Sequence, residues 1–129
     1  MVKQINNFEI KIFSYLPNPR IWKATITSRL SDVNVHVLGT KPENIKNWLW
    51  DFDAHELSDK DVIDYKNNTT QGRTGFSVKL YKTEKFLKTQ PFGTVPAAFS
   101  PDGEVGIFES NSIMRLAARL GKNKNNIYG

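Results

Sequence analysis

The stretch GTVPAAFSPDGEVGIFESNSIMRLAARLG, residues 93–121, carries the clearest structural pattern in the chain. Its apolar runs PAAF and VGIF flank Ser100-Pro101-Asp102-Gly103, and a turn with proline second and glycine fourth is typical of a β-hairpin. Apolar residues then recur at helical spacing before Gly121, a common helix stop: Ile113, Leu116, Ala117 and Leu120. The stretch therefore predicts two antiparallel strands followed by a helix.

Pro96, at the head of the first of these strands, is the first candidate for a functional position. A residue before proline is pushed toward an extended conformation, and a central strand rarely tolerates proline. If the Val95–Pro96 bond is cis, the backbone N–H and C=O of Val95 turn outward. They could then pair with an extended, peptide-like ligand as one more strand would. The sequence alone leaves the isomer of this bond open.

Glu109 and Ser110 form the second candidate, where the second strand becomes a helix. A helix N-terminus favours a carboxylate, and the Ser110 hydroxyl can add a hydrogen bond to it. Glu109 offers a negative partner for an ammonium group, so the pair matches the head group of a free α-amino acid. The alternative interpretation is that Ser110 or Asn111 caps the helix and Glu109 is merely exposed.

The N-terminal part of the chain predicts a strand, a helix and a second strand. Residues 8–14, FEIKIFS, alternate apolar and polar side chains, as a strand does. Asn18 can cap a helix with Pro19 in its first turn, and the helix runs to about Leu30 on apolar residues spaced by four: Trp22, Ile26 and Leu30. Val33, Val35 and Val37 mark the next strand. A unit of this length predicts a parallel strand pair.

Between about residues 40 and 80 lies a long insertion. Thr40 and Glu43 have capping-box spacing, and apolar residues after them predict one face of a helix: Ile45, Trp48, Leu49 and Phe52. We interpret this face as core or as a domain contact. The polar run KNNTTQGRTG predicts a loop. Thr83 can cap a short helix that carries Phe86 and Leu87 and ends at Pro91.

Together these elements predict one α/β domain over residues 1–129. Their order is βαβ, an insertion, then ββα, which is the order of a thioredoxin-like domain. We expect one four-stranded mixed sheet with helices on both faces, and the long insertion, about residues 40–80, between its second and third strands.

Composition narrows the function further. The chain has 129 residues, a net charge of +5 and no cysteine, which excludes disulfides and thiolate nucleophiles. It shows no signal peptide, no apolar run that could span a membrane and no RNA-binding signature, so we expect a cytoplasmic protein without membrane or direct nucleic-acid partners. An acidic stretch over residues 51–64 is interpreted as a solvated face. His55 lies in it without metal-ligand spacing, so no metal is expected.

The residues collected so far resemble the glutathione-binding half of the glutathione transferase N-terminal domain. Residues 8–38 and 81–121 are similar to the transferase-like domain of elongation factor 1-gamma and to related fungal transferase-like proteins. The resemblance implies glutathione as ligand or substrate, with Pro96 as a cis-proline and Val95 paired with the cysteinyl backbone. It also implies that Glu109 and Ser110 bind the γ-glutamyl head.

The sequence departs from that family at the group that activates the thiol. The family's hydroxyl or thiol most nearly corresponds to Asn18 here, with Tyr15 and Ser14 as further candidates for a catalytic role. Alternatively, Asn18 is a simple N-cap and Tyr15 a packing residue.

The resemblance leaves activity uncertain. The family's helical second domain supplies most of the electrophile pocket, and we expect it to be absent from this chain and turnover by residues 1–129 to be weak or absent. One hypothesis is therefore a glutathione-binding, transferase-type domain. Another is a non-catalytic, elongation factor 1-gamma-like interaction module in translation, and a third is a structural relative that has lost glutathione. We also expect apolar surface on the helix over residues 112–120, available to a helical domain, a protein partner or a homodimer.

Overall fold

The computed structural model describes residues 9–71 and 78–121. Its strands, in chain order, are β1 (Ile10–Tyr15), β2 (Val35–Thr40), β3 (Trp48–Trp50), β4 (His55–Glu56), β5 (Thr69–Gln71), β6 (Lys79–Lys82), β7 (Ala97–Phe99) and β8 (Gly106–Ile107). Its helices are α1 (Pro19–Leu30), the 3-10 helix η1 (Pro42–Asn47), α2 (Asp59–Asp64), α3 (Glu84–Thr89) and α4 (Ser110–Leu120).

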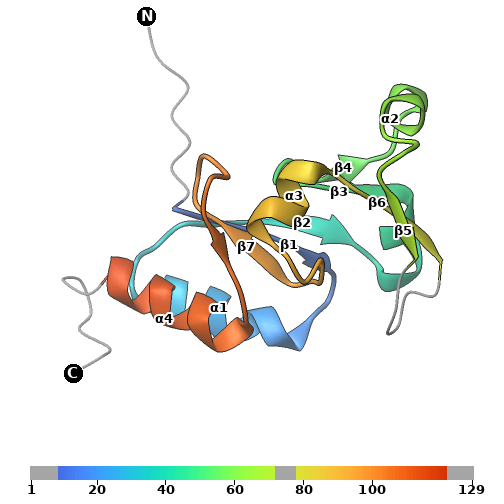
Figure 1. Cartoon of the computed structure of the whole chain (residues 1–129). Helices are drawn as coiled ribbons and strands as arrows, with labels where there is room; N and C mark the ends of the chain where they lie inside the picture. The colour runs from blue at the N-terminus through green and yellow to red at the C-terminus, as the bar shows by residue number, and fades with distance from the viewer. Residues whose placement is uncertain (1–8, 72–77, 122–129) are drawn as a thin grey trace, which may run out of the picture.

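The central sheet has the strand order β2-β1-β7-β8 (Figure 1). β1 and β2 are parallel, which confirms the predicted strand–helix–strand unit. β7 is antiparallel to β1, and β8 is antiparallel to β7, so the predicted hairpin is confirmed as well. Its turn closes with a 2.9 Å hydrogen bond from the N–H of Gly103 to the carbonyl of Ser100, and Gly103 has φ +75°. That backbone conformation favours glycine.

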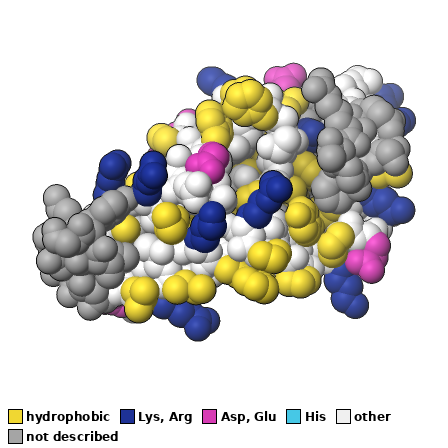
Figure 2. Space-filling view, turned by 90° about the horizontal axis from the view of Figure 1, so that it is seen from below, with side chains coloured by type: hydrophobic (Ala, Val, Ile, Leu, Met, Phe, Trp, Pro, Cys, Tyr) yellow, Lys and Arg dark blue, Asp and Glu magenta, His cyan; other side chains and the backbone are white. Residues whose placement is uncertain are grey.

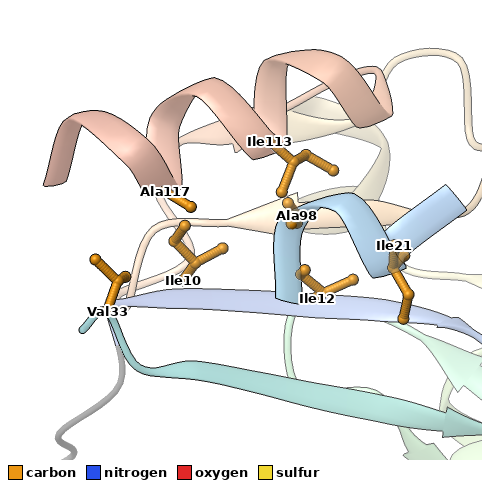
Figure 3. Close-up of a cluster of buried hydrophobic side chains, with 8 residues drawn as sticks. Ile10, Ile12, Ile21, Val33, Ala98, Ile113 and Ala117 are labelled. Carbon is orange, nitrogen blue, oxygen red and sulfur yellow. The ribbon is translucent and has the colours of Figure 1, made fainter. Parts of the chain in front are cut away.

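Helices α1 and α4 cover one face of this sheet. The side chains between them and the sheet form a single buried cluster (Figure 3): Ile10, Ile12, Ile21, Ala24, Val33, Ala98, Ile113 and Ala117. As predicted, α1 is capped by Asn18 and begins at Pro19. Its buried residues are Ile21, Ala24 and Ser28, so the spacing-four stripe of Trp22, Ile26 and Leu30 points to solvent instead of the core.

The opposite face of the sheet is covered by α3 and by part of the insertion (Figure 1). Thr83 caps α3, as predicted, by accepting a 3.0 Å hydrogen bond from the N–H of Phe86. The second buried cluster fills this side: Phe13, Ile45, Trp50, Ala54, Leu80, Phe86, Ala97 and Phe99. Edge-to-face contacts join Phe13 to Trp50 and Phe86, and aromatic pairs of this kind add to the stability gained from burial.

The prediction of a single four-stranded sheet is wrong, because strands of the insertion form a second sheet with β6. This sheet has the order β4-β3-β6-β5, with β3 parallel to β6, so the molecule contains two small mixed sheets. The helix predicted through Ile45 and Phe52 is also wrong. A 3-10 helix ends at Asn47, and the chain then extends into β3. Trp48-Leu49-Trp50 is aromatic-rich, and pairing with β6 outweighs its apparent helical spacing.

Two smaller expectations in the insertion are corrected too. Thr40 lies in β2 and forms no capping box, because η1 has Lys41 at its N-cap without a side-chain hydrogen bond. Part of the polar run expected to be a loop is strand β5, which pairs with β6. Residues 66–68 of that run form a turn, as expected, and residues 72–75 lie outside the described residues, as does Phe8 at the start of the first predicted strand.

Helix α4 begins at Ser110 and ends against α1. The apolar surface expected over residues 112–120 is largely used inside the domain, since Ile113, Ala117 and Ala118 are buried. Leu120, which is 47% exposed, remains on the surface. At the C-cap, a Cβ added to Gly121 would lie 2.1 Å from the carbonyl oxygen of Ser31. Only glycine therefore allows the two helix ends to approach this closely.

Candidate functional site

The register of the central sheet brings the predicted site residues to one end of it. β1 pairs antiparallel with β7, with Phe13 opposite Ala97, so Tyr15 at the end of β1 and Val95 just before β7 lie at the same end of the sheet. β7 pairs with β8 at Ala98 and Ile107. The hairpin therefore brings Glu109 and Ser110, which follow β8, to the same end of the sheet as Val95 and Pro96, which precede β7.

The Val95–Pro96 peptide bond is cis, as predicted. Val95 is half-buried, and its side chain packs against the second cluster. Among the described residues, neither backbone group of Val95 takes part in a turn or cap hydrogen bond. A second cis bond, Leu16–Pro17, follows β1 at the same end of the sheet. This second cis bond was not predicted. The only signal for it in the sequence is a proline between a strand and a helix.

Glu109 occupies an unusual place at the start of α4. It has φ +72° and is the N-cap of the helix, with its Oε1 accepting a 3.2 Å hydrogen bond from the N–H of Ser112. Its side chain is exposed, and Ser110 is the first residue of the helix. The alternative interpretation, in which Ser110 or Asn111 caps the helix, is therefore wrong about the cap, although Glu109 is exposed as it supposed. The carboxylate and the hydroxyl therefore lie together at a helix N-terminus, where the backbone N–H groups favour an anion.

The candidate thiol-activating residues differ in access to solvent. Ser14 and Asn18 are both buried, and the Asn18 amide donates a 2.9 Å hydrogen bond to the Ser14 hydroxyl. The Asn18 Oδ1 accepts from the N–H of Arg20, so its side chain also acts as the N-cap. Ser14 in turn donates to the carbonyl of Tyr15 at 2.9 Å. Tyr15 is the one of the three whose side chain is partly exposed.

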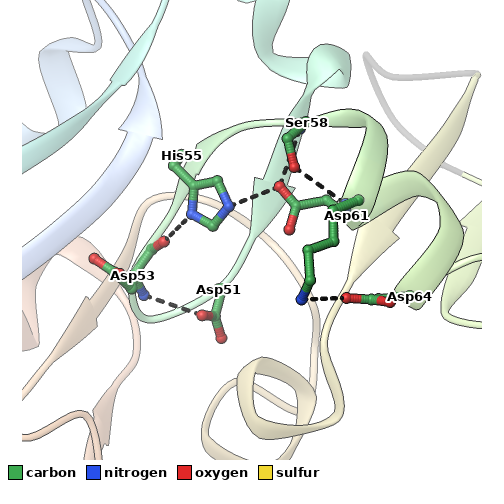
Figure 4. Close-up of polar contacts among 7 residues, drawn as sticks. Asp51, Asp53, His55, Ser58, Asp61 and Asp64 are labelled. Atoms are coloured by element: carbon green, nitrogen blue, oxygen red, sulfur yellow. Dashed lines mark hydrogen bonds and ion pairs between the residues drawn. The ribbon is translucent and has the colours of Figure 1, made fainter.

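The acidic stretch contains a polar cluster that the sequence analysis did not assign to any role (Figure 4). The two ring nitrogens of His55 lie 2.7 Å from the carbonyl oxygen of Asp53 and 2.9 Å from the carboxylate of Asp61. Asp61 also forms a capping box with Ser58 at the start of α2. The cluster thus ties the segment after β3 to α2.

The charges in this cluster stabilise one another. Partial burial lowers the pKa of the His55 imidazole, but hydrogen bonds to Asp53 and Asp61 outweigh this effect and raise the pKa above its ordinary value of 6.5. The pKa of Asp61 is lowered, mainly by the hydrogen bond from the backbone of Ser58 and also by His55. Within the described ranges, no three His, Cys, Asp or Glu side chains are grouped so as to hold a metal ion.

Two surface hollows are found among the described residues, and Thr40, which lines the first, pairs with Tyr15 in the central sheet. One, of about 270 Å³, is lined by Thr40, Asn44, Asn47, Trp48 and Glu56. The other, of about 360 Å³, lies between α2 and α3 and is lined by Asp51, Asp64, Tyr65, Asn68, Thr83, Glu84 and Lys85. Neither contains a residue that the sequence assigned to glutathione. In the portion of the chain that the structure describes, no helix is long and apolar enough to cross a membrane.

The fold defines the class that this chain resembles: an α/β domain like the N-terminal, thioredoxin-like domain of glutathione transferases. A glutathione transferase F2 from Populus trichocarpa matches with a TM-score of 0.50 and 19% identity, over 93% of this chain and 40% of its own. A Bombyx mori glutathione transferase gives a TM-score of 0.45, 14% identity and coverage of 86% and 35%. Ure2p in complex with glutathione matches with a TM-score of 0.48 and 12% identity, over 95% of this chain and 40% of its own.

The match to the Populus protein, at 19% identity, bears on the fold alone. The chain spans about 40% of the length of the Populus protein. No protein-family model and no curated protein sequence matches the chain.

Proposed function

We propose that this chain is a glutathione-binding domain of the transferase type. The observation that carries the proposal is the convergence of Val95–Pro96 and Glu109–Ser110 at one end of the central sheet, through the pairings of β1, β7 and β8. A peptide-like ligand with an amino-acid head group suits this combination. Its extended part would pair with a strand-like backbone, and its head would lie at the N-terminus of α4.

In this proposal each group of the ligand has a partner. The γ-glutamyl carboxylate accepts hydrogen bonds from the N-terminal N–H groups of α4 and from the Ser110 hydroxyl. The ammonium pairs with Glu109. The Oε1 of this residue accepts a hydrogen bond from the N–H of Ser112, and its second carboxylate oxygen accepts one from the ligand ammonium. The backbone of Val95 pairs with the cysteinyl residue. Tyr15 is then our candidate to donate a hydrogen bond to the thiolate, because it ends β1 at the same end of the sheet as Val95 and is partly exposed.

The second candidate function is a non-catalytic interaction module similar to that of elongation factor 1-gamma. The buried Ser14–Asn18 pair favours it, because each of these side chains already has a hydrogen-bond partner inside the domain. A domain without a thiol-activating group would bind glutathione without turnover, or would keep only the fold.

Calorimetric titration of the chain with glutathione, followed by an assay with an aromatic electrophile, separates these functions. The proposal expects binding, with weak turnover that falls further in Tyr15→Phe. Binding with no turnover in either protein would favour the interaction module. If glutathione does not bind at all, the proposed ligand is wrong, and the chain is a structural relative that has lost it.

A further inference from the structure

Lys82, the last residue of β6, reaches from the second sheet to the loop that precedes Pro96. Its Nζ donates a 2.7 Å hydrogen bond to the carbonyl oxygen of Gly93 and lies 5.0 Å from the centre of the Trp50 ring. A hydrogen bond from a charged donor is roughly twice as strong as a neutral one. The Trp50 ring adds a favourable cation–π contact on the same ammonium group.

Gly93 is held from two sides. Its N–H donates a 2.8 Å hydrogen bond to the carbonyl of Gln90 at the end of α3, while its carbonyl accepts from Lys82. It is buried and has φ +61°, a conformation that favours glycine. A Cβ at this position would lie 3.0 Å from the Lys82 Nζ, so the lysine packs directly over the glycine.

Only Thr94 separates this anchored glycine from Val95. Val95 packs its side chain on the same cluster that contains Trp50 and Leu80 of the second sheet. The second sheet thus contacts the loop at two neighbouring points, one polar and one apolar. A loop fixed in this way presents the Val95 backbone in one orientation, and a fixed binding element loses less entropy when a ligand binds.

We propose that Lys82 is a positioning residue for the glutathione site, and that the second sheet supports the loop whose Val95 backbone contacts the ligand. This inference rests on the proposed function. It gives the second sheet, which the insertion forms together with β6, a role that neither the sequence nor the fold similarity suggests. Lys82 acts through Gly93 and does not itself contact the ligand.

The test compares three variants. Lys82→Met keeps the unbranched chain over Trp50 but removes the charged donor. Lys82→Arg keeps a charged donor. Lys79→Met makes the same charge change at an exposed position on the same strand. We expect Lys82→Met to weaken glutathione binding roughly three- to tenfold, because a loop that is less ordered before binding loses more entropy when the ligand binds. Lys82→Arg should restore most of the affinity, and Lys79→Met should bind as the parent does.

A second measurement does not need the ligand. Amide hydrogen exchange of residues 93–95 in the unliganded protein should speed up in Lys82→Met and return toward the parent rate in Lys82→Arg. If the parent fails to bind glutathione, the proposed function fails, and this exchange measurement alone decides the role of Lys82. Parent-like exchange at residues 93–95 in Lys82→Met would overturn the inference, and so would equal losses of affinity in Lys82→Met and Lys79→Met.

Discussion

At the scale of single residues, Glu109 combines a left-handed backbone conformation with a side chain that caps a helix. Its φ of +72° is uncommon for a residue with a Cβ, and its carboxylate caps α4 while remaining exposed. Glycine or asparagine would satisfy the backbone more easily, and serine or aspartate is a more usual cap. Glutamate is therefore an unusual residue for a helix cap with this backbone conformation.

Replacing Glu109 by Gln should separate charge from shape. The Gln amide oxygen can still accept the hydrogen bond from the N–H of Ser112, so the melting temperature should change little. Glutathione affinity should fall about tenfold or more, because a charge-assisted hydrogen bond contributes about 1.5–3 kcal/mol. Calorimetry measures the affinity, and Glu43→Gln, an exposed glutamate in η1, is the control. Equal affinity in the parent and Glu109→Gln would refute the head-group assignment.

Ser110→Ala tests the other half of the head-group site. Because Glu109 is the cap and Ser110 the first helical residue, the alanine should leave the melting temperature close to that of the parent. Glutathione affinity should nevertheless fall roughly tenfold, since one hydrogen bond to the ligand carboxylate is lost. Thermal unfolding and calorimetry on the same samples check both points. A lower melting temperature with unchanged affinity would return Ser110 to a purely structural role.

At the scale of elements, the ends of α1 and α4 meet without room for a side chain. Gly121→Ala should destabilise the domain by about 1–3 kcal/mol, because the new methyl group would lie 2.1 Å from the Ser31 carbonyl and the helices would have to separate. Urea unfolding measures this loss. Leu120→Ala, one residue earlier at a position that is 47% exposed, is the control and should cost less. Equal stability of the parent and Gly121→Ala would mean that this contact is loose.

The attachment of α2 should depend on pH. Both ring nitrogens of His55 face oxygen acceptors, and only the protonated ring can donate to both. The folded-state pKa is raised above 6.5, so this stabilisation is fully present below about pH 6.5 and is lost as the pH rises through the folded-state value. Asp61 has a lowered pKa and remains charged throughout that window.

Amide exchange of α2, corrected for the intrinsic effect of pH, should therefore show less protection at about pH 8.5 than at about pH 5.5, either side of the ordinary histidine pKa. His55→Gln should remove this difference, whereas His36→Gln, at the other histidine of the chain, should retain it. If α2 is equally protected at both pH values in the parent, the histidine does not control the attachment of this helix.

At the scale of the whole molecule, the sequence predicts the central domain well because its signals are local. Asn18-Pro19, Thr83 and the turn at Ser100–Gly103 each fix an element boundary through capping or turn chemistry, and the structure has all three. The second sheet could not be predicted in this way. β3 pairs with β6 across about thirty residues, and the pairing of Leu49 with Tyr81 leaves no periodic signal in either segment.

The candidate site likewise has a part that local sequence signals predict and a part that depends on long-range strand pairing. Pro96 is conspicuous in sequence because a central strand rarely tolerates proline, and Glu109 because it stands beside Ser110 where a strand is followed by a helix. Their meeting at one end of the sheet depends on hairpin register, which the turn sequence predicts. The support that Lys82 gives to Gly93 depends on the unpredicted second sheet, so no sequence pattern could have identified it.

Within residues 9–71 and 78–121, an apolar stripe on α1 remains exposed. Trp22, Ile26 and Leu30 on α1 are 52%, 58% and 55% exposed. Figure 2 shows hydrophobic side chains interspersed with basic ones, and few acidic ones, on the face of the molecule seen from below. α1 itself carries three cations, Arg20, Lys23 and Arg29, and no acidic residue. Two copies meeting through this stripe would bury apolar surface but would bring like charges together.

We therefore expect weak self-association that strengthens with salt, because salt screens the repulsion between cations and leaves apolar burial intact. Sedimentation over a range of protein and salt concentrations measures it. Ile26→Lys should keep the chain monomeric without lowering its melting temperature, since the side chain is 58% exposed and lies outside the core. Ile63→Lys, at a 69% exposed isoleucine on α2, is the matched control and should associate like the parent. A parent that remains monomeric at high salt and hundreds of micromolar would show that this stripe does not pair with itself. Association that weakens with salt would point to ion pairs at some other surface.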